Sequence, residues 1–217
     1  MEQAQTAPGL QKPALRGFLH QLAFFLAIPA GVTVGLFAES ERARIAAAIF
    51  AGTVVAMFGA SALYHRFTWS PQTRRRLRRL DHAAIFGLIA GSYTPFGLLV
   101  LHGPSRIVVL AIVWAGAASA IVAKIAWATA PKWFTLVIGV ALGWVAIAVL
   151  PQLLHRGLTI ALLTILGGAC YTLGALVYAL RRPNPTPAVF GYHELFHALV
   201  VAAVGLQYAA VGYLVLR

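Results

Sequence analysis

Residues 45–64 read IAAAIFAGTVVAMFGASALY, a stretch of twenty residues without a charged side chain. An α-helix of about 20 mostly apolar residues crosses the hydrocarbon core of a bilayer. The chain has seven apolar runs of about this length, which are Gly17–Phe37, Ile45–Tyr64, Ala83–Leu101, Ile107–Ala123, Trp133–Leu150, Leu158–Leu180 and Leu195–Leu216. No run shows the alternating pattern of a membrane β-strand. The sequence therefore predicts an all-α, polytopic membrane protein with a seven-helix transmembrane bundle.

The composition of the whole chain supports a membrane protein. Of its 217 residues, 60% are hydrophobic and only 10% are charged, and the mean hydropathy is +0.82. A soluble domain carries about 25% charged residues, so this chain has too few polar side chains to cover a water-soluble globule. Its net charge of +12 does not indicate nucleic acid as a partner, because a nucleic-acid-binding protein also needs a water-soluble surface. The composition excludes a soluble enzyme, a disordered chain and a disulfide scaffold.

The basic residues predict how the bundle lies in the membrane, because Lys and Arg are enriched in cytoplasmic connections. One side of the predicted bundle carries twelve basic residues, namely Lys12, Arg16, Arg66, Arg74, Arg75, Arg76, Arg78, Arg79, Lys124, Lys132, Arg181 and Arg182. The other side carries the remaining five, Arg42, Arg44, Arg106, Arg156 and Arg217. We therefore expect a multi-pass protein of the plasma membrane, with a cytoplasmic N-terminus and an external C-terminus. Residues 1–15 would be a short cytoplasmic segment, and residues 16–217 a single transmembrane domain.

The arginine run RRRLRR at residues 74–79 has two interpretations. The first is a topology determinant beside anionic head groups, where each charge is worth about 1 kcal/mol. The second is a specific site for a lipid head group or a partner. The first interpretation is the more common for such runs.

Polar side chains at the edges of the spans are candidates for function, because ionisable groups in a membrane are costly. Ser61 and His65 end the second span, Asp81 and His82 begin the third, and His193, Glu194 and His197 begin the seventh. The predicted topology places all of them at the cytoplasmic ends of their helices. Residues that are far apart in the sequence would therefore meet at one face of the membrane.

The spacing of these residues indicates a metal site. His193 and His197 are four residues apart and share one helix face. Three imidazoles with one open position form a common catalytic zinc site. We therefore expect His65, His193 and His197 to bind Zn²⁺, while Asp81 orients or deprotonates the bound water or binds the metal through it. Ser61, four residues before His65, would lie on the same face of its helix.

Each of these residues also has a simpler explanation. Asp81 could stabilise the start of its helix through the dipole and by capping, and Ser61 could bond back to the carbonyl of Met57. His20, near the cytoplasmic end of the first span, is expected at the membrane interface. His82 points about 100° away from Asp81 and is expected beside the site or at the interface. The joint occurrence of the polar residues on one face favours the metal site.

The string HELFH at residues 193–197 also matches the H-E-x-x-H pattern of zinc proteases, in which the glutamate is the general base. An intramembrane metalloprotease is therefore an alternative. It is disfavoured because no obvious carboxylate ligand lies deep in another span and because the pattern stands at the start of a terminal helix. Glu194 is expected instead to be a favourable negative charge in the first helical turn.

Three motifs together resemble the hemolysin III family, whose wider relatives are the progestin and adipoQ receptors and, more distantly, the alkaline ceramidases. The motifs are S-x-x-x-H at Ser61 and His65, D-H-x-x-I-F-x-x-x-x-G-x-Y-T-P from Asp81 to Pro95, and H-x-x-x-H at His193 and His197. The resemblance covers about residues 16–217. It implies a zinc site near the inner leaflet, held by the three histidines, with Asp81 and Ser61 close by.

The position of the site and its resemblance to ceramidases suggest zinc-dependent hydrolysis of a lipid amide. Asp81 would accept the proton of the water, and Ser61 would steady the oxyanion or hold Asp81 in place. One alternative is a receptor-like or regulatory protein with structural zinc. Another is a lytic pore, for which the uniformly apolar spans give little support. The expected partners are membrane lipids and a lipid-like substrate or ligand, and no nucleic acid.

Overall fold

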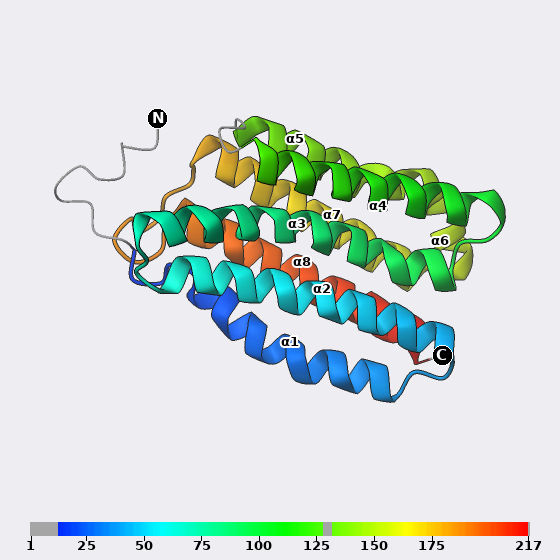
Figure 1. Ribbon diagram of the computed structural model, residues 1–217. Coiled ribbons are helices and arrows are strands. Elements are labelled where there is room, and N and C mark those ends of the chain that lie inside the picture. Colours follow the sequence, from blue (N-terminus) through cyan, green and yellow to red (C-terminus); the bar gives the residue numbers. More distant parts are fainter. Residues whose placement is uncertain (1–12, 128–131, 217) are drawn as a thin grey trace.

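The protein is a bundle of long helices that are connected by short loops (Figure 1). The computed structural model describes residues 13–127 and 132–216. Seven helical spans within these residues are long and apolar enough to cross a membrane, which confirms the predicted fold class. The segment 1–12 with Lys12, and also Arg217, lie outside the described residues, so the expectations for them stay predictions.

Six of the spans are single helices, and the fifth is interrupted. The single helices are α1 (Phe18–Leu36), α2 (Glu41–Arg66), α3 (Pro71–Leu99), α4 (Gly103–Ala126), α7 (Leu158–Leu180) and α8 (Tyr192–Val215). The fifth span consists of α5 (Lys132–Gly143), the 3₁₀ helix η2 (Trp144–Val149) and α6 (Leu150–Arg156). Helix α2 packs between α1 and α3, α3 also packs against α4, and α7 packs against α8.

Helix α3 begins well before the predicted third span. The Ser70 hydroxyl accepts a hydrogen bond from the Thr73 backbone N–H at 3.3 Å, and Pro71 occupies the first helical position. Both features favour a helix start at this point, so the arginine run belongs to the helix. Asp81 lies ten residues after Pro71, in the interior of α3. The prediction that Asp81 and His82 begin the helix is therefore wrong, and so is the capping explanation for Asp81.

The interruption of the fifth span was not predicted, because the apolar run Trp133–Leu150 gives no sign of it. The Tyr93 hydroxyl of α3 lies 2.6 Å from the carbonyl oxygen of Gly143 and 2.9 Å from that of Leu142. It also accepts a hydrogen bond from the Ala146 backbone N–H at 2.8 Å. Backbone polar groups within a membrane need partners inside the protein. Tyr93 supplies these partners from a neighbouring helix, which allows the helix to change its form here.

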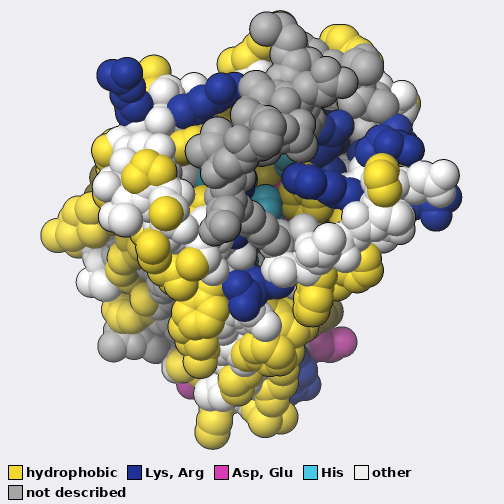
Figure 2. All heavy atoms as spheres, turned by 90° about the vertical axis from the view of Figure 1, so that its left-hand side faces the viewer, with side chains coloured by type: hydrophobic (Ala, Val, Ile, Leu, Met, Phe, Trp, Pro, Cys, Tyr) yellow, Lys and Arg dark blue, Asp and Glu magenta, His cyan; other side chains and the backbone are white. Residues whose placement is uncertain are grey.

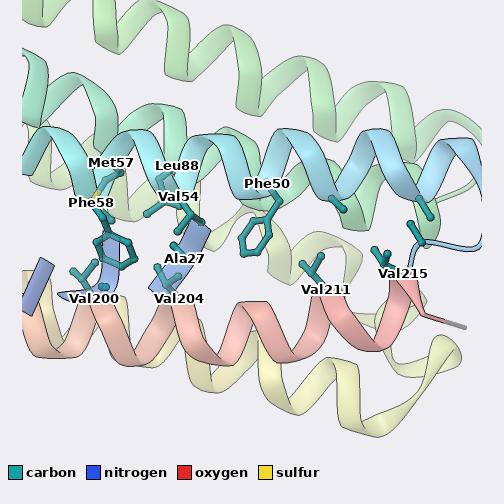
Figure 3. Packing of buried hydrophobic residues seen from close by; sticks show 14 residues of the cluster. Ala27, Phe50, Val54, Met57, Phe58, Leu88, Val200, Val204, Val211 and Val215 are labelled. Carbon is teal, nitrogen blue, oxygen red and sulfur yellow. The ribbon is translucent and has the colours of Figure 1, made fainter. Parts of the chain in front are cut away.

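The main hydrophobic core lies between α2 and α8 (Figure 3). Phe50, Val54 and Phe58 of α2 face α8, whose Val200 and Val204 belong to the same buried cluster. All five side chains are at most 7% exposed. This packing holds the last turn of α2 beside the first turn of α8, at the end of the bundle where α3 begins.

A close contact between α2 and α3 depends on a glycine. A Cβ atom added to Gly91 would lie 1.9 Å from the Thr53 Oγ1 atom, a distance that no side chain tolerates. Gly91 therefore lets the two helix backbones approach each other closely. The contact fixes the axial position of Asp81 on α3 relative to His65 on α2.

We predict that Tyr93→Phe destabilises the protein by about 1–3 kcal/mol, because the variant leaves the Ala146 N–H without its partner. Thermal unfolding in detergent, followed by circular dichroism, measures the change. Tyr208→Phe is a matched control, since the Tyr208 hydroxyl donates to the Ala27 carbonyl in an uninterrupted helix. Equal losses in the two variants would contradict the bridging role of Tyr93.

Candidate metal centre

Three histidines meet at the arginine-rich end of the bundle, which we define as the end where α3 begins with Arg74–Arg79. One ring nitrogen from each of His65, His193 and His197 lies within 4.8 Å of the other two. The Nε2 atoms of His65 and His193 are 3.3 Å apart. Two nitrogens bound to a tetrahedral zinc ion at about 2.0–2.1 Å are also about 3.3 Å apart. The predicted ligand set is thus brought together with a spacing that suits a tetrahedral metal ion.

The positions of these histidines follow from the helix ends. His65 is the penultimate residue of α2, and His193 and His197 lie in the first two turns of α8 on one face. The side chains of His65 and His197 are buried, at 8% and 2% exposed. The antiparallel packing of the helix ends therefore assembles the three imidazoles inside the protein.

Asp81 and Ser61 lie beside the three histidines, as predicted. The Oδ2 atom of Asp81 is 3.7 Å from the Nε2 atom of His65. Ser61 is a hydrogen-bond partner of the Asp81 carboxylate, and its Oγ atom is 2.8 Å from the Nδ1 atom of His20. Because an ionised carboxylate only accepts hydrogen bonds, the Ser61 hydroxyl donates to Asp81 and accepts from the Nδ1–H group of His20.

His20 belongs to the site, and the prediction that it lies at the membrane interface is wrong. Its side chain is only 3% exposed, and its ring stacks on that of His197 with centroids 3.8 Å apart and planes 5° apart. Gly17 permits this position, because a Cβ there would lie 2.5 Å from the Cβ of His65 and its φ angle is +76°. The sequence feature that could have assigned His20 to the site is its position at the same end of the predicted bundle as the other three histidines.

Glu194 stabilises the start of α8, as expected for a negative charge in the first turn. Its Oε1 atom accepts a hydrogen bond from Arg16 Nε, and its Oε2 atom accepts one from the Gly191 backbone N–H at 2.9 Å. The carboxylate is 1% exposed, and it is not among the described residues that line the cavity beside the histidines. Both oxygens are thus engaged away from the site, which disfavours the protease alternative.

A cavity of about 250 Å³ begins at the histidines and continues into the bundle. Its lining comes mainly from α3, α5, η2, α7 and α8, and it is polar near the histidines and mostly apolar elsewhere. Lining residues on α3 extend from Asp81 to Phe96, which is about 22 Å along the helix axis. The hydrocarbon part of one membrane leaflet is about 15 Å thick. The lining of the cavity is therefore longer than the hydrocarbon part of one leaflet, a length that suits an acyl chain.

The surface around the histidines is basic. In Figure 2, which shows the arginine-rich end, Lys and Arg side chains surround the point where histidine side chains are visible. Arg74, Arg75 and Arg76 are exposed on the first turns of α3. Anionic groups are therefore attracted to the end of the bundle that carries the candidate metal centre.

Known proteins match nearly the whole chain. A family profile described as "Haemolysin-III related" matches residues 9–208. The chain belongs to the hemolysin III family. Its relatives include a hemolysin-3 homolog from Bacillus subtilis (strain 168), which is 30% identical over 88% of this chain and 89% of the relative. Hemolysin-3 from Bacillus cereus is 29% identical over 91% of this chain and 89% of the relative.

This hemolysin III protein is also similar to a receptor. The adiponectin receptor protein of Drosophila melanogaster is 28% identical over 80% of this chain and 43% of the receptor. The resemblance to the wider group of progestin and adipoQ receptors is thereby confirmed. Family membership and the seven apolar helical spans together identify a multi-pass membrane protein.

We predict that purified protein binds about one divalent metal ion per chain and that His65→Ala, His193→Ala and His197→Ala each lose it. The site contains three imidazole nitrogens that can bind a metal ion, and each substitution leaves only two of them. Elemental analysis after exhaustive dialysis measures the metal. His155→Ala is the control, because His155 is exposed in α6 outside the cluster. Stoichiometric metal that survives all three substitutions would contradict the site.

Proposed function

We propose that this protein is a zinc-dependent hydrolase of lipid amide bonds and acts at the inner leaflet of the plasma membrane. The observation that carries the proposal is the position of three clustered imidazoles at the polar end of a long apolar cavity. A lipid whose acyl chain enters this cavity would hold its head group and its amide bond near the imidazoles. The excess of Lys and Arg at this end supports a cytoplasmic orientation.

The donor set fits zinc. Zinc prefers imidazole nitrogen, and its catalytic sites have three protein ligands and one open position. His65, His193 and His197 would supply those ligands, and the 3.3 Å spacing between His65 Nε2 and His193 Nε2 agrees with tetrahedral geometry. When bound, zinc provides a Lewis acid for the amide carbonyl and lowers the pKa of a water molecule.

Asp81 is suited to proton transfer. Its carboxylate lies 3.7 Å from His65 Nε2 and lines the cavity, so an amide placed at the histidines would be within its reach. In the proposed reaction, a carboxylate oxygen of Asp81 accepts the proton of the attacking water and then donates it to the leaving amine. A positioned base of this kind contributes about 10²–10⁴-fold to a hydrolytic rate.

Ser61 and His20 orient this base. The hydrogen bonds from His20 Nδ1–H to Ser61 Oγ and from the Ser61 hydroxyl to Asp81 hold the carboxylate in one orientation. Because the Ser61 hydroxyl has only one hydrogen to donate, these contacts favour the role of holding Asp81 over that of steadying the oxyanion. The parallel stack of His20 on His197 restrains the orientation of that metal ligand as well.

The second candidate function is a receptor-like or regulatory protein with structural zinc. It is favoured by the proximity of Asp81 to the ligand His65, because a carboxylate oxygen that joined three imidazoles would complete a closed four-ligand shell. The similarity to a protein named adiponectin receptor supports the same alternative. The visible absorption spectrum of protein loaded with cobalt in place of zinc distinguishes the two functions. Added azide should change the spectrum of an open catalytic site, whereas a closed four-ligand shell has no position for azide and its spectrum should not change.

We predict that the purified, zinc-loaded protein releases fatty acid from an acyl amide in detergent. The rate should fall by about 10²–10⁴-fold in Asp81→Asn, because the amide side chain cannot accept a proton. Mass spectrometry of the released fatty acid measures the rate, and elemental analysis checks that the variant keeps its zinc.

Glu39→Gln is the matched control, because it removes one exposed negative charge from the loop between α1 and α2. Its rate should equal that of the unmodified protein. The absence of zinc-dependent fatty acid release from ceramides and from other acyl amides would contradict the hydrolase. Leakage of dye from protein-containing liposomes would instead favour the lytic pore.

A further inference from the structure

Lys124 is a cation in the wall of the cavity. It lies in the last turn of α4, and its Nζ atom donates a hydrogen bond to the Thr135 Oγ1 atom of α5 at 2.9 Å. Both residues line the cavity. Arg78, near the start of α3, is close enough to act on Lys124 electrostatically. The ammonium of Lys124 is thus held in the wall of a mostly apolar cavity.

No carboxylate of the described residues forms an ion pair with Lys124. Glu39 and Glu41 lie in or after the loop between α1 and α2, at the opposite end of the bundle (Figure 1). Asp81 and Glu194 have partners inside the protein, namely Ser61 and His65 for the first and Arg16 for the second. A cation next to a membrane cavity is costly unless it is compensated. The ammonium of Lys124 is therefore suited to an anionic ligand.

The cavity that Lys124 shares with the candidate metal centre limits the ligand. Arg78 precedes Asp81 by three residues on α3, which is about 4.5 Å along the helix axis. His82, another lining residue, is four residues after Arg78 and lies on the same helix face. Lys124, His82 and Asp81 all line this cavity, so one ligand in it can contact both the ammonium of Lys124 and the metal centre. A lipid amide with an anionic head group carries its negative charge on the head-group side of the amide, so it could place both groups along this cavity.

We propose that Lys124, with Arg78 beside it, binds the carboxylate or phosphate of an acyl amide that has an anionic head group. The placement of the amide rests on the proposed hydrolase function, whereas the binding of the anion does not. The ammonium of Lys124 donates to an anionic oxygen, and Thr135 holds the side chain toward the cavity. A neutral acyl amide fills the same cavity but leaves the ammonium without an anionic partner, so it binds more weakly.

The test compares two probes of nearly equal size, N-oleoylglycine and N-oleoylethanolamine, which differ in having a carboxylate or a neutral hydroxymethyl group. Microscale thermophoresis in a non-ionic detergent measures both dissociation constants for full-length protein in the Asp81→Asn background, where turnover is expected to be slowed by about 10²–10⁴-fold. We expect tighter binding of N-oleoylglycine by about tenfold, the usual contribution of a hydrogen bond to a charged group. Lys124→Gln should remove this preference without changing the affinity for N-oleoylethanolamine, and Lys124→Arg should keep most of it.

Arg76→Gln is the matched control. Arg76 is exposed and lies about 200° around α3 from Arg78, so this variant loses the same charge on the opposite helix face. Arg78→Gln should weaken N-oleoylglycine binding severalfold, whereas Arg76→Gln should not. Equal affinity for the two probes, or equal effects of Arg76→Gln and Lys124→Gln, would overturn the proposal.

A third arm separates a lipid from a soluble anion. Acetylglycine has the same amide and carboxylate but no long acyl chain, and it should not displace N-oleoylglycine at equal concentration. Equal displacement would overturn the assignment to a lipid head group. If the preference for N-oleoylglycine depends on Lys124 but no acyl amide is hydrolysed by the unmodified protein, the anion site stands and the hydrolase proposal fails.

Discussion

The burial of ionisable side chains in an apolar bundle is the constraint on which the rest of the structure depends. Such groups are stable in a membrane protein only when they have polar partners. Here the partners come from different helices: His20 of α1 bonds to Ser61 of α2, and Ser61 bonds to Asp81 of α3. His65 at the end of α2 lies beside His193 of α8. The polar centre thus joins four helices at one end, while apolar packing alone joins α2 and α8 further along.

The polar centre also requires that its helices lie close together, because short polar side chains form hydrogen bonds only if their backbones are near each other. Gly17 brings the start of α1 against His65, and Gly91 brings α3 against Thr53 of α2. Any side chain at either glycine would push the helices apart and lengthen the hydrogen bonds between them. The hydrogen bonds of the centre are therefore set by helix packing, and the packing in turn is restricted by two positions that have no side chain.

The sequence predicted the seven spans and the grouping of His65, Asp81, His193 and His197, because apolar length and rare charges are local properties of a chain. Other features depend on contacts between helices, which no local pattern describes. The broken fifth span is one, since its backbone partner is Tyr93 on another helix. The burial of His20 is another, since a histidine near a span end is equally suited to the interface until α1 is packed against its neighbours.

The membrane topology alone does not account for the position of every basic residue outside the polar centre, and Lys124 in the cavity wall is the example. Topology requires only an excess of Lys and Arg on one side, and exposed residues such as Arg76 satisfy it. Lys124 differs, because its ammonium is hydrogen-bonded to Thr135 and lines the cavity. A topological role alone does not require the ammonium to bond Thr135 in the wall of the cavity. A lipid amide with an anionic head group would use both Lys124 and the polar end of this otherwise mostly apolar cavity.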